Sequence, residues 1–370
     1  MIDWNAVRRE FPTLERYTYL NTASFGQLPH RSVAAVEAHF ARRDELACAD
    51  FLEWFDDADE IRGLAARLIH CEPDDIAFFQ NASSAVSLLT EGMKWSEGDR
   101  ILTLEHEFPN QLYLAQSCGR RGDIVPYERF FSALTPRTRL VIVSTVNYTS
   151  GLRPDLEAMA EACRTNGTLF CVDGTQSLGA LTLDIRKVEP DMFAVDGYKW
   201  LLSPNGAGFA YIPPRVRAWL APRTIGWRSD KRWREVDALN HGAPEFKKSA
   251  EKYEGGMLPF PSLYGMGASI SMMLELGPHE IERRALQLAD CLRGTLRNLG
   301  ARLLSDTDPA YISQIVAANW QGVDSSLLSR RLRDRRILTA ARHGNLRVST
   351  HFYNNEADIE RLADALRDIL

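Results

Sequence analysis

Residues 169–212 read LFCVDGTQSLGALTLDIRKVEPDMFAVDGYKWLLSPNGAGFAYI. Three apolar runs, LFCVD, MFAV and GFAYI, alternate in this stretch with segments rich in glycine and polar residues. Short, nearly uncharged runs are typical of strands that are buried on both faces of a sheet. Asp173 ends the first run, and Lys199 closely follows the second. We therefore expect both side chains at the carboxyl edge of a mostly parallel sheet, where ligands bind in α/β proteins.

The same alternation extends toward the N-terminus. The apolar runs DIAFF, RILTL and LVIVST are separated by helix-like stretches such as SSAVSLLTEGM and PDLEAMAEACRTNG. Apolar residues at helical spacing predict two helices between 31 and 70, and two long helices around 262–276 and 279–298. This order predicts an α/β fold with a large, doubly wound, mostly parallel sheet.

Polar side chains that follow the predicted strands should share one rim of this sheet; they are Asn81, His106, Asn147, Asp173 and Lys199. No linker rich in glycine, serine or proline divides the chain, and its tail has the pattern of a small α+β unit. We predict a large domain of residues 15–260 and a small domain formed by residues 1–14 and 261–370.

The composition is that of an ordinary globular protein. The chain has 370 residues, of which 45% are hydrophobic and 25% charged, so disordered and collagen-like classes are excluded. A net charge of −5 argues against nucleic acid or an anionic membrane as a partner. The six cysteines show no C-x-x-C spacing and the eight histidines no metal-ligand spacing, and we find no signal peptide or membrane-spanning run. We therefore expect a reduced, cytoplasmic protein without a metal.

Lysine is scarce in this chain, which contains seven lysines and 37 arginines. Biased codon usage explains the ratio, but a lysine in an apolar, glycine-flanked context then stands out, and Lys199 is one. A lysine held among apolar groups has a lowered pKa and can act as an amine nucleophile toward aldehydes. Taken alone, the same residue also fits a surface lysine whose stem snorkels along apolar neighbours.

The segments DGTQSLG (173–179) and DGYKWLL (196–202), in this order and at this distance, resemble the class V aminotransferase family of fold-type I pyridoxal-phosphate enzymes. Isopenicillin N epimerase-like proteins, kynureninase and cysteine desulfurases belong to the same family. The resemblance extends from Leu20 to Asn354, nearly the whole chain. It implies pyridoxal 5'-phosphate as the cofactor, bound by the large domain, and a homodimer with active sites near the interface.

The resemblance implies a role for each residue of these two segments. Lys199 would form the Schiff base with the cofactor aldehyde and then act as the base at the substrate Cα. Asp173 would pair with the pyridinium nitrogen, and Gln176 would reach the phenolic oxygen of the cofactor. A carboxylate beside this nitrogen raises its pKa and keeps the ring protonated as an electron sink.

The phosphate needs a cradle, and FFQNASSAVSLL (78–89) combines a strand, a turn of small polar residues and a helix. Amides at a helix N-terminus bind phosphate well. By resemblance, the amides of Ala82 and Ser83 and the Ser83 hydroxyl make these contacts, and Tyr198 adds its phenol. The alternative is ordinary N-capping by Ser83 or Ser84 with nothing bound.

Two aromatic residues in EHEFPNQLY (105–113) are candidates for a lid over the cofactor ring. The similarity to kynureninase favours Phe108, whose ring would stack on the pyridine face. His106 is the other candidate, and a capping or surface histidine is its alternative reading. Trp227 and the glycine before it resemble a Gly-Trp pair of kynureninase-like members of the family. This resemblance implies that Trp227 contacts the phosphate of a neighbouring subunit.

Substrate recognition requires a residue for the α-carboxylate, for which a bidentate arginine is suited. The segment GNLRVSTHFYN (344–354) resembles the C-terminal motif of the family and makes Arg347 the match. A surface ion pair is the alternative for any one of 37 arginines. The N-terminal turn TYLNTASFG matches the carboxylate-side loop of the family around Asn21 and Ala23.

Together these features predict an enzyme that acts at the Cα of an amino-acid substrate, with aminotransferase as the best single description. An epimerase or racemase and a C–S or C–C lyase are the alternatives within the family. No cysteine lies between Leu292 and Leu370, which argues against a cysteine desulfurase because that enzyme needs a cysteine nucleophile in this region. A nucleotide-binding α/β protein would need a G-x-G-x-x-G after its first strand, and none follows. A non-catalytic relative would have no need of Lys199, Asp173 and Gln176.

Overall fold

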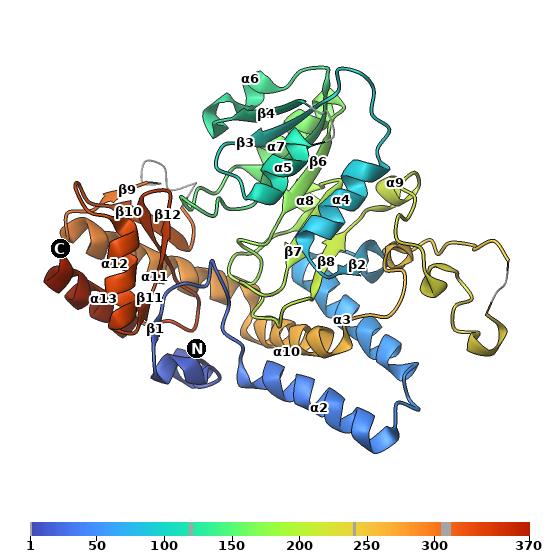
Figure 1. Ribbon diagram of the computed structural model, residues 1–370, viewed down its shortest axis with the longest axis horizontal. Helices are drawn as coiled ribbons and strands as arrows, with labels where there is room; N and C mark the ends of the chain where they lie inside the picture. The colour runs from blue at the N-terminus through green and yellow to red at the C-terminus, as the bar shows by residue number, and fades with distance from the viewer. Residues whose placement is uncertain (1, 118–120, 240–241, 305–311) are drawn as a thin grey trace.

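The computed structural model describes residues 2–117, 121–239, 242–304 and 312–370. A seven-stranded sheet forms its centre (Figure 1). In spatial order its strands are β2 (Ile76–Phe79), β8 (Gly208–Tyr211), β7 (Met192–Asp196), β6 (Leu169–Asp173), β5 (Thr138–Ser144), β3 (Arg100–Leu104) and β4 (Arg121–Val125). Only β8 runs antiparallel to its neighbours, so the predicted mostly parallel sheet is confirmed.

Helices cover both faces of this sheet. Helices α3 (Glu53–Ile69), α7 (Leu156–Asn166) and α10 (Phe260–Leu276) contribute to one apolar layer. Helices α4 (Ala82–Gly92) and α5 (Pro109–Gln116) contribute to the other layer. Each central strand supplies alternate residues to the two layers, because successive side chains of a strand point to opposite faces. This double burial explains why the strands are nearly uncharged in sequence.

The predicted strands and helices are present within a few residues of their expected bounds. The two helices expected between 31 and 70 are α2 (His30–Leu46) and α3, and the two long later ones are α10 and α11 (Pro278–Asn298). Strand β4 was not predicted. Its sequence, RGDIV, carries charges because β4 is the edge strand and pairs only with β3.

A second, four-stranded antiparallel sheet forms the C-terminal unit. Its order is β12 (Ala340–Arg342), β13 (Asn345–Ser349), β10 (Ile315–Asn319) and β9 (Arg302–Leu303). Apolar residues of α11, α12 (Ser325–Asp334) and α13 (Glu356–Ile369) pack with it into one core. The predicted domain bounds, 15–260 for the large domain and 1–14 with 261–370 for the small one, stay a prediction.

The N-terminal segment is bound to this C-terminal unit. Strand β1 (Thr18–Tyr19) pairs in parallel with β11 (Ile337–Leu338). Arg8, at the end of α1 (Trp4–Arg8), forms an ion pair with the buried Asp358 at 2.8 Å. The remaining short helices are η1 (Pro12–Glu15), η2 (Pro73–Asp75), η3 (Tyr127–Arg129), α6 (Phe130–Ala133), α8 (Ile185–Val188), α9 (Pro214–Arg217), η4 (Trp227–Ser229), η5 (Val236–Ala238) and η6 (Ala250–Tyr253).

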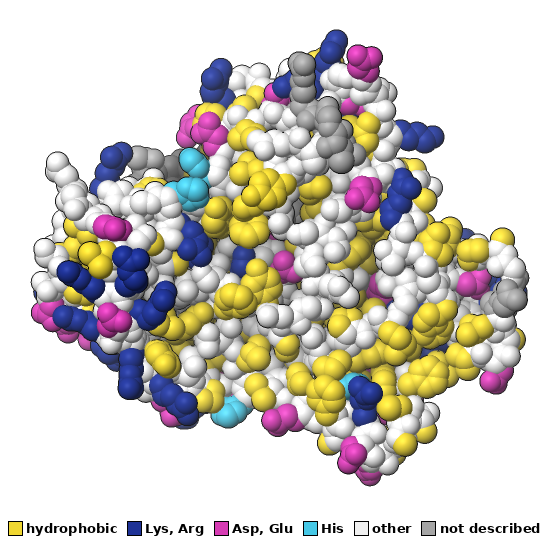
Figure 2. All heavy atoms as spheres, viewed as in Figure 1, with side chains coloured by type: hydrophobic (Ala, Val, Ile, Leu, Met, Phe, Trp, Pro, Cys, Tyr) yellow, Lys and Arg dark blue, Asp and Glu magenta, His cyan; other side chains and the backbone are white. Residues whose placement is uncertain are grey.

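Exposed apolar side chains gather on one side of the molecule. Figure 2 shows them over α2 and over the neighbouring segment between α9 and α10. They include Phe40 and Leu46 on α2, and Ile225 and Met257 on the segment. Within the described residues, every helix is too short or too polar to span a bilayer.

The turn that carries Lys199 packs directly against the N-terminal segment. The Gly26 N–H donates to the Tyr198 carbonyl at 2.9 Å, and a Cβ added at Gly26 would lie 1.9 Å from the Lys199 carbonyl oxygen. At Gly179, which has φ +105°, an added Cβ would lie 2.2 Å from the Trp200 carbonyl oxygen. No residue larger than glycine fits at Gly26 without displacing the backbone of Lys199.

We expect Gly26→Ala to lower the free energy of unfolding by about 2 kcal/mol, because the new methyl group overlaps backbone atoms. Gly63→Ala is the matched control: Gly63 lies inside α3, and no atom lies within 4 Å of the added Cβ. That control should gain about 0.5–1 kcal/mol from better helix propensity. Urea unfolding measures both effects. Equal stability of the two variants would contradict the predicted contact.

Candidate active site

Lys199 lies in the turn after β7, at the carboxyl edge of the sheet. It is only 6% exposed, and its Nζ lies 5.1 Å from the Phe108 ring centroid and 5.4 Å from that of Tyr198. Among the described residues, no carboxylate is paired with this amine. Burial lowers the pKa of Lys199 to about 8, although Asp173 and Asp196 favour the charged form. The amine is therefore largely stripped of water and is a better nucleophile than a surface lysine.

Asp173 ends β6 and is also buried. Its Oδ2 accepts a hydrogen bond from Gln111 Nε2 at 2.7 Å, and its Oδ1 accepts one from the Thr175 N–H at 2.9 Å. Each carboxylate oxygen thus has one donor, and the second lone pair of each oxygen is available to a ligand. Sequence reasoning did not single out Gln111; its place three residues after Phe108, on the inner face of α5, was the available signal.

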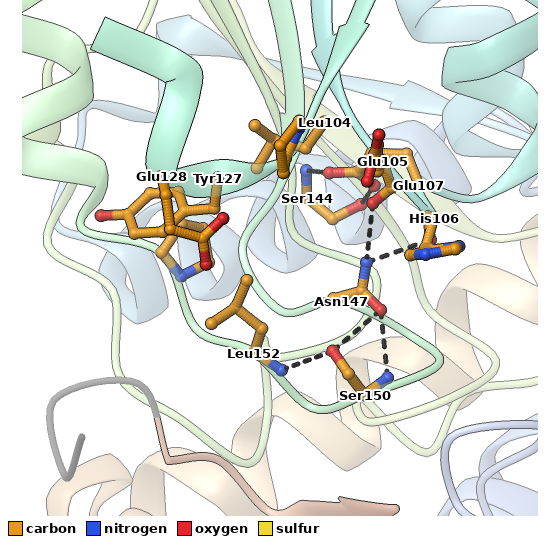
Figure 3. Close-up of a pocket in the computed structure, with 12 residues that line it drawn as sticks. Leu104, Glu105, His106, Glu107, Tyr127, Glu128, Ser144, Asn147, Ser150 and Leu152 are labelled. Carbon is orange, nitrogen blue, oxygen red and sulfur yellow. Dashed lines mark hydrogen bonds between the residues drawn. The ribbon is translucent and has the colours of Figure 1, made fainter. Parts of the chain in front are cut away.

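A second buried carboxylate, Glu107, lies beside this group. The Ser144 N–H donates to its Oε1 at 2.7 Å and the Ser144 hydroxyl donates to its Oε2. Burial raises the pKa of Glu107 to about 7, and the nearby Asp173 charge adds to the effect. Figure 3 shows Glu107 and Ser144 on the wall of a cavity of about 180 Å³ whose lining residues do not include Lys199. The cavity therefore lies beside the lysine site rather than at it.

Gln176 joins the sheet edge to the N-terminal turn. Its Nε2 donates to the Ala23 carbonyl at 3.2 Å, and its Oε1 accepts from the Trp200 indole N–H at 3.0 Å. Gln176 and Ala23 are both site candidates from the sequence, and the fold brings these two residues into contact. Gln314 Nε2 donates to the Gln176 backbone carbonyl at 2.7 Å, so the C-terminal unit contacts the same residue.

The residue that caps the N-terminus of α4 is neither of the two serines suggested by the sequence. The cap is Asn81, whose Oδ1 accepts from the Ser84 N–H at 2.9 Å, so capping by Ser83 or Ser84 is wrong. Asparagine fits this role because its short side chain reaches the first-turn amides. The Ala82 N–H, predicted to bind phosphate, donates to Asp196 Oδ1 at 3.1 Å.

Phe108 and His106 lie differently with respect to the lysine. Phe108 is the N-cap residue of α5; its ring faces Lys199 and meets the Tyr148 ring edge-on at 5.3 Å. His106 (Figure 3) is exposed and has φ +61°. Its ring lies 5.7 Å from that of His343. Of the two candidates, Phe108 is the one in contact with the lysine environment.

Arg347 is buried in the middle of β13 without an acidic partner among the described residues. It donates to the Tyr148 carbonyl at 2.8 Å and to the Ser24 hydroxyl at 2.7 Å, while its Nε has no hydrogen-bond partner. Burial lowers the pKa of Arg347 to about 9. Asn21 Oδ1 accepts from the Ser24 hydroxyl at 2.9 Å, so the predicted N-terminal loop does meet Arg347. A buried cation without a counter-charge is a site for an anion.

Trp227 packs against aromatic residues of its own chain. Its ring packs edge-on against Phe55 at 5.8 Å and Trp233 at 5.5 Å. The predicted contact of Trp227 with a neighbouring subunit stays a prediction. Within the described residues, no group of three histidine, cysteine or acidic side chains could hold a metal ion. The five described cysteines are free, and Cys118 lies outside the described residues.

The chain resembles known proteins over most of its length. Residues 52–362 match the family model described as aminotransferase class-V. A probable cysteine desulfurase of Methanothermobacter thermautotrophicus is 26% identical over 98% of this chain and 97% of its own length. Isopenicillin N epimerase of Streptomyces clavuligerus is 29% identical over 98% of each chain. A mutant of C-DES, with glycine covalently linked to its PLP cofactor, has the same fold, with a TM-score of 0.89 at 23% identity over 98% of this chain and 99% of that one.

The expectation against a cysteine desulfurase gains no support from these relatives, because a probable cysteine desulfurase is among them. The relatives are named for different reactions, although all cover nearly the whole chain. The similarity therefore indicates a common cofactor chemistry and leaves the reaction undecided.

We expect Lys199→Met to raise the free energy of unfolding of the cofactor-free protein at pH 7 by about 2–3 kcal/mol. The reason is that the folded state lowers the pKa of this buried amine to about 8, below its usual value of about 10.4. The unfolded chain therefore binds more protons at this residue than the folded protein does, so the free energy of unfolding of the wild type rises with pH. The advantage of the variant should therefore shrink by about 1 kcal/mol between pH 7 and pH 9. Urea unfolding at both pH values measures this difference; a constant difference would contradict it.

Proposed function

Because the chain belongs to the aminotransferase class-V family and its cofactor is pyridoxal phosphate (PLP), we propose that it is an aminotransferase acting at the Cα of an amino-acid substrate. The observation that carries this proposal is that two buried cations, the Lys199 amine and the Arg347 guanidinium, lie near enough for the Arg347 charge to act on the pKa of Lys199, and that neither is paired with a carboxylate among the described residues. The first group suits an aldehyde, and the second suits a carboxylate.

The residues at this rim fit the cofactor. When bound, PLP supplies an aldehyde that condenses with amines and a ring that accepts the electron pair left when a bond to the substrate Cα breaks. Asp173 would hold the pyridinium nitrogen, Gln176 the phenolic oxygen, and Phe108 one face of the ring. The first turn of α4, with the Ala82 and Ser83 amides, and the Tyr198 phenol would hold the phosphate. Gln111 Oε1 and Arg347 Nε, both buried without a partner, support a site that is completed by ligand groups.

Lys199 would both attach the cofactor and move the substrate proton. Its lowered pKa leaves a useful fraction of free amine at neutral pH, which is the form that attacks an aldehyde. The same Nζ would act as the base that removes the proton from the substrate Cα. The Phe108 and Tyr198 rings beside Nζ exclude water from this transfer.

We favour transamination over epimerisation because transamination would need only Lys199, which would remove and return a proton on one face of the substrate, whereas a two-base epimerisation would need a second base on the opposite face. Burial raises the pKa of Tyr198 to about 12, so this phenol stays protonated and does not serve as a second base. Epimerase or racemase activity is the second candidate, favoured by the 29% identity to isopenicillin N epimerase. A C–S or C–C lyase is the third, since C-DES, whose fold matches this one, is named a cystine C–S lyase.

We also propose that the protein is a cytoplasmic homodimer with active sites near the interface. The exposed apolar side chains on α2 and on the segment between α9 and α10 support an interface there. In this arrangement Trp227, within that segment, would reach the phosphate of the neighbouring subunit. The free state of the five described cysteines agrees with a reducing compartment.

Incubation with PLP should give a visible absorption band, and borohydride should then fix the cofactor to Lys199, as peptide mass spectrometry would show. Lys199→Ala should lose the covalent product and turnover. An amino-acid panel with a keto-acid acceptor then identifies the reaction. Pyridoxamine phosphate formation supports transamination, deuterium uptake with loss of optical activity supports epimerisation, and release of pyruvate or ammonia supports a lyase. The absence of any visible band would refute the proposed function.

Arg347→Gln should raise KM for the amino-acid substrate about 100-fold, because it removes the buried cation that would pair with the carboxylate. The PLP absorption band should be retained, since Arg347 is assigned to the substrate and not to the cofactor. Arg335→Gln, which removes an exposed ion pair with Asp368, is the control and should leave KM unchanged. An unchanged KM in Arg347→Gln would contradict the assignment.

A further inference from the structure

The carboxylate of Asp196 lies at the N-terminus of α4, where the phosphate group is proposed to bind. Asp196 ends β7, and its own N–H donates to Thr175 Oγ1 at 3.0 Å, which fixes the backbone of this residue. Its Oδ1 accepts from the Ala82 N–H at 3.1 Å. A side chain of this chain thus already uses an amide that sequence reasoning assigned to the phosphate.

Two anions cannot both use this amide without cost. The first-turn amides of a helix have no partner within the helix and attract one negative group. A phosphate placed there would meet the like charge of the half-buried Asp196, which disfavours both groups when both are ionised. A protonated carboxyl, in contrast, would donate a hydrogen bond to a phosphate oxygen. The protonation state of Asp196 therefore decides whether this residue opposes or helps phosphate binding.

The charges that face Asp196 come from the neighbouring strand and from the following turn. Asp173 on β6 opposes its ionisation, and Lys199 in the turn favours it. Helix α4 contributes the Ala82 amide, and the Tyr198 phenol lies in the same turn as Lys199. Burial is the largest effect and raises the pKa of Asp196 to about 6 even without a phosphate. A further negative group would raise the pKa more.

We propose that Asp196 takes up a proton when the phosphate of PLP enters the cradle and that it then donates its O–H to the phosphate. This inference rests on the proposed phosphate site at α4. A solvent acid, hydronium or a buffer acid, gives up the proton, the carboxylate forms an O–H bond with it, and no other covalent bond changes. The Ala82 N–H is released to the phosphate. Asp196 is thus a cofactor-binding residue that couples cofactor affinity to pH.

The coupling has a defined sign. If binding takes up one proton at Asp196, the Kd for PLP rises about tenfold for each pH unit above the pKa of the free carboxyl group. Other groups on PLP also titrate, and replacing Asp196 changes the charge that acts on Lys199. Pyridoxal reacts with the same Lys199 amine but has no phosphate, so the difference between the PLP ratio and the pyridoxal ratio isolates the effect of Asp196 on the phosphate.

Asp196→Asn is the informative variant, because its carbonyl oxygen can still accept from Ala82 and its amide can donate to phosphate without a proton from solvent. Asp184→Asn is the control. Asp184 caps α8, and its hydrogen bond to Arg186 lowers its pKa to about 2, so it stays ionised throughout the experiment. Asp196→Ser provides a second variant if the asparagine protein does not fold, as judged by circular dichroism.

The experiment measures the Kd of PLP for the cofactor-free protein by absorption and fluorescence titration from pH 6.5 to 8.5. The expected result is a wild-type to Asp196→Asn ratio of Kd values that grows about tenfold per pH unit. The ratio for Asp184→Asn should stay constant. With pyridoxal, which lacks the phosphate, the ratio for Asp196→Asn should also be independent of pH.

A constant PLP ratio for Asp196→Asn would overturn the proposal while leaving the proposed function intact, since PLP would still bind. A pH-dependent ratio that is equally large for pyridoxal would also overturn it, because the phosphate would then not be involved. If neither protein bound PLP at any pH, the proposed function would fail as well. The three results are thus distinguishable.

Discussion

The burial of the Lys199 amine without a paired carboxylate is the constraint on which the rest of this structure depends. Removing an ammonium group from water is costly unless the charge is neutralised, and here the fold lowers the pKa of the amine instead. The backbone around Lys199 must be held firmly to maintain such a state. Gly26 and Gly179 provide this by close packing against the carbonyl groups of Lys199 and Trp200, which larger residues would prevent. A destabilising group is thus retained where it is chemically useful.

Three carboxylates share the rim with this amine, and the fold gives each a different set of donors. Asp173 has Gln111 and Thr175, Glu107 has both donors of Ser144, and Asp196 has a helix amide. Burial raises the pKa of Glu107 to about 7 and that of Asp196 to about 6. Carboxyl groups in such different settings can hold different protonation states at the same pH. A site that is to bind both a cationic ring nitrogen and an anionic phosphate needs this difference, because an ionised carboxylate suits the nitrogen and a protonated carboxyl suits the phosphate.

The proposed substrate side of the site is formed by segments that are far apart in the sequence. Arg347 from the C-terminal unit meets Ser24 from the N-terminal turn and the Tyr148 carbonyl that follows β5. The pairing of β1 with β11 holds the N-terminal segment on the C-terminal unit, and Gln176 links that segment back to the large sheet. The buried guanidinium is therefore positioned by both sheets, and a movement of one sheet relative to the other would alter the anion site.

Local patterns of apolar and polar residues were sufficient to predict part of the fold. Strands buried on both faces must be apolar throughout, so the central strands, the covering helices and the rim with Asp173 and Lys199 could be predicted. The edge strand β4 could not, because an open edge tolerates the charges of RGDIV. The roles of the site residues came from resemblance and remain predictions. Three contacts became known only from the folded chain: Gln111 donates to Asp173, Arg347 donates to Ser24, and the Ala82 amide of α4 donates to Asp196. Such contacts join segments separated by 60 to more than 300 residues, and they depend on how the packed layers close rather than on any spacing along the chain.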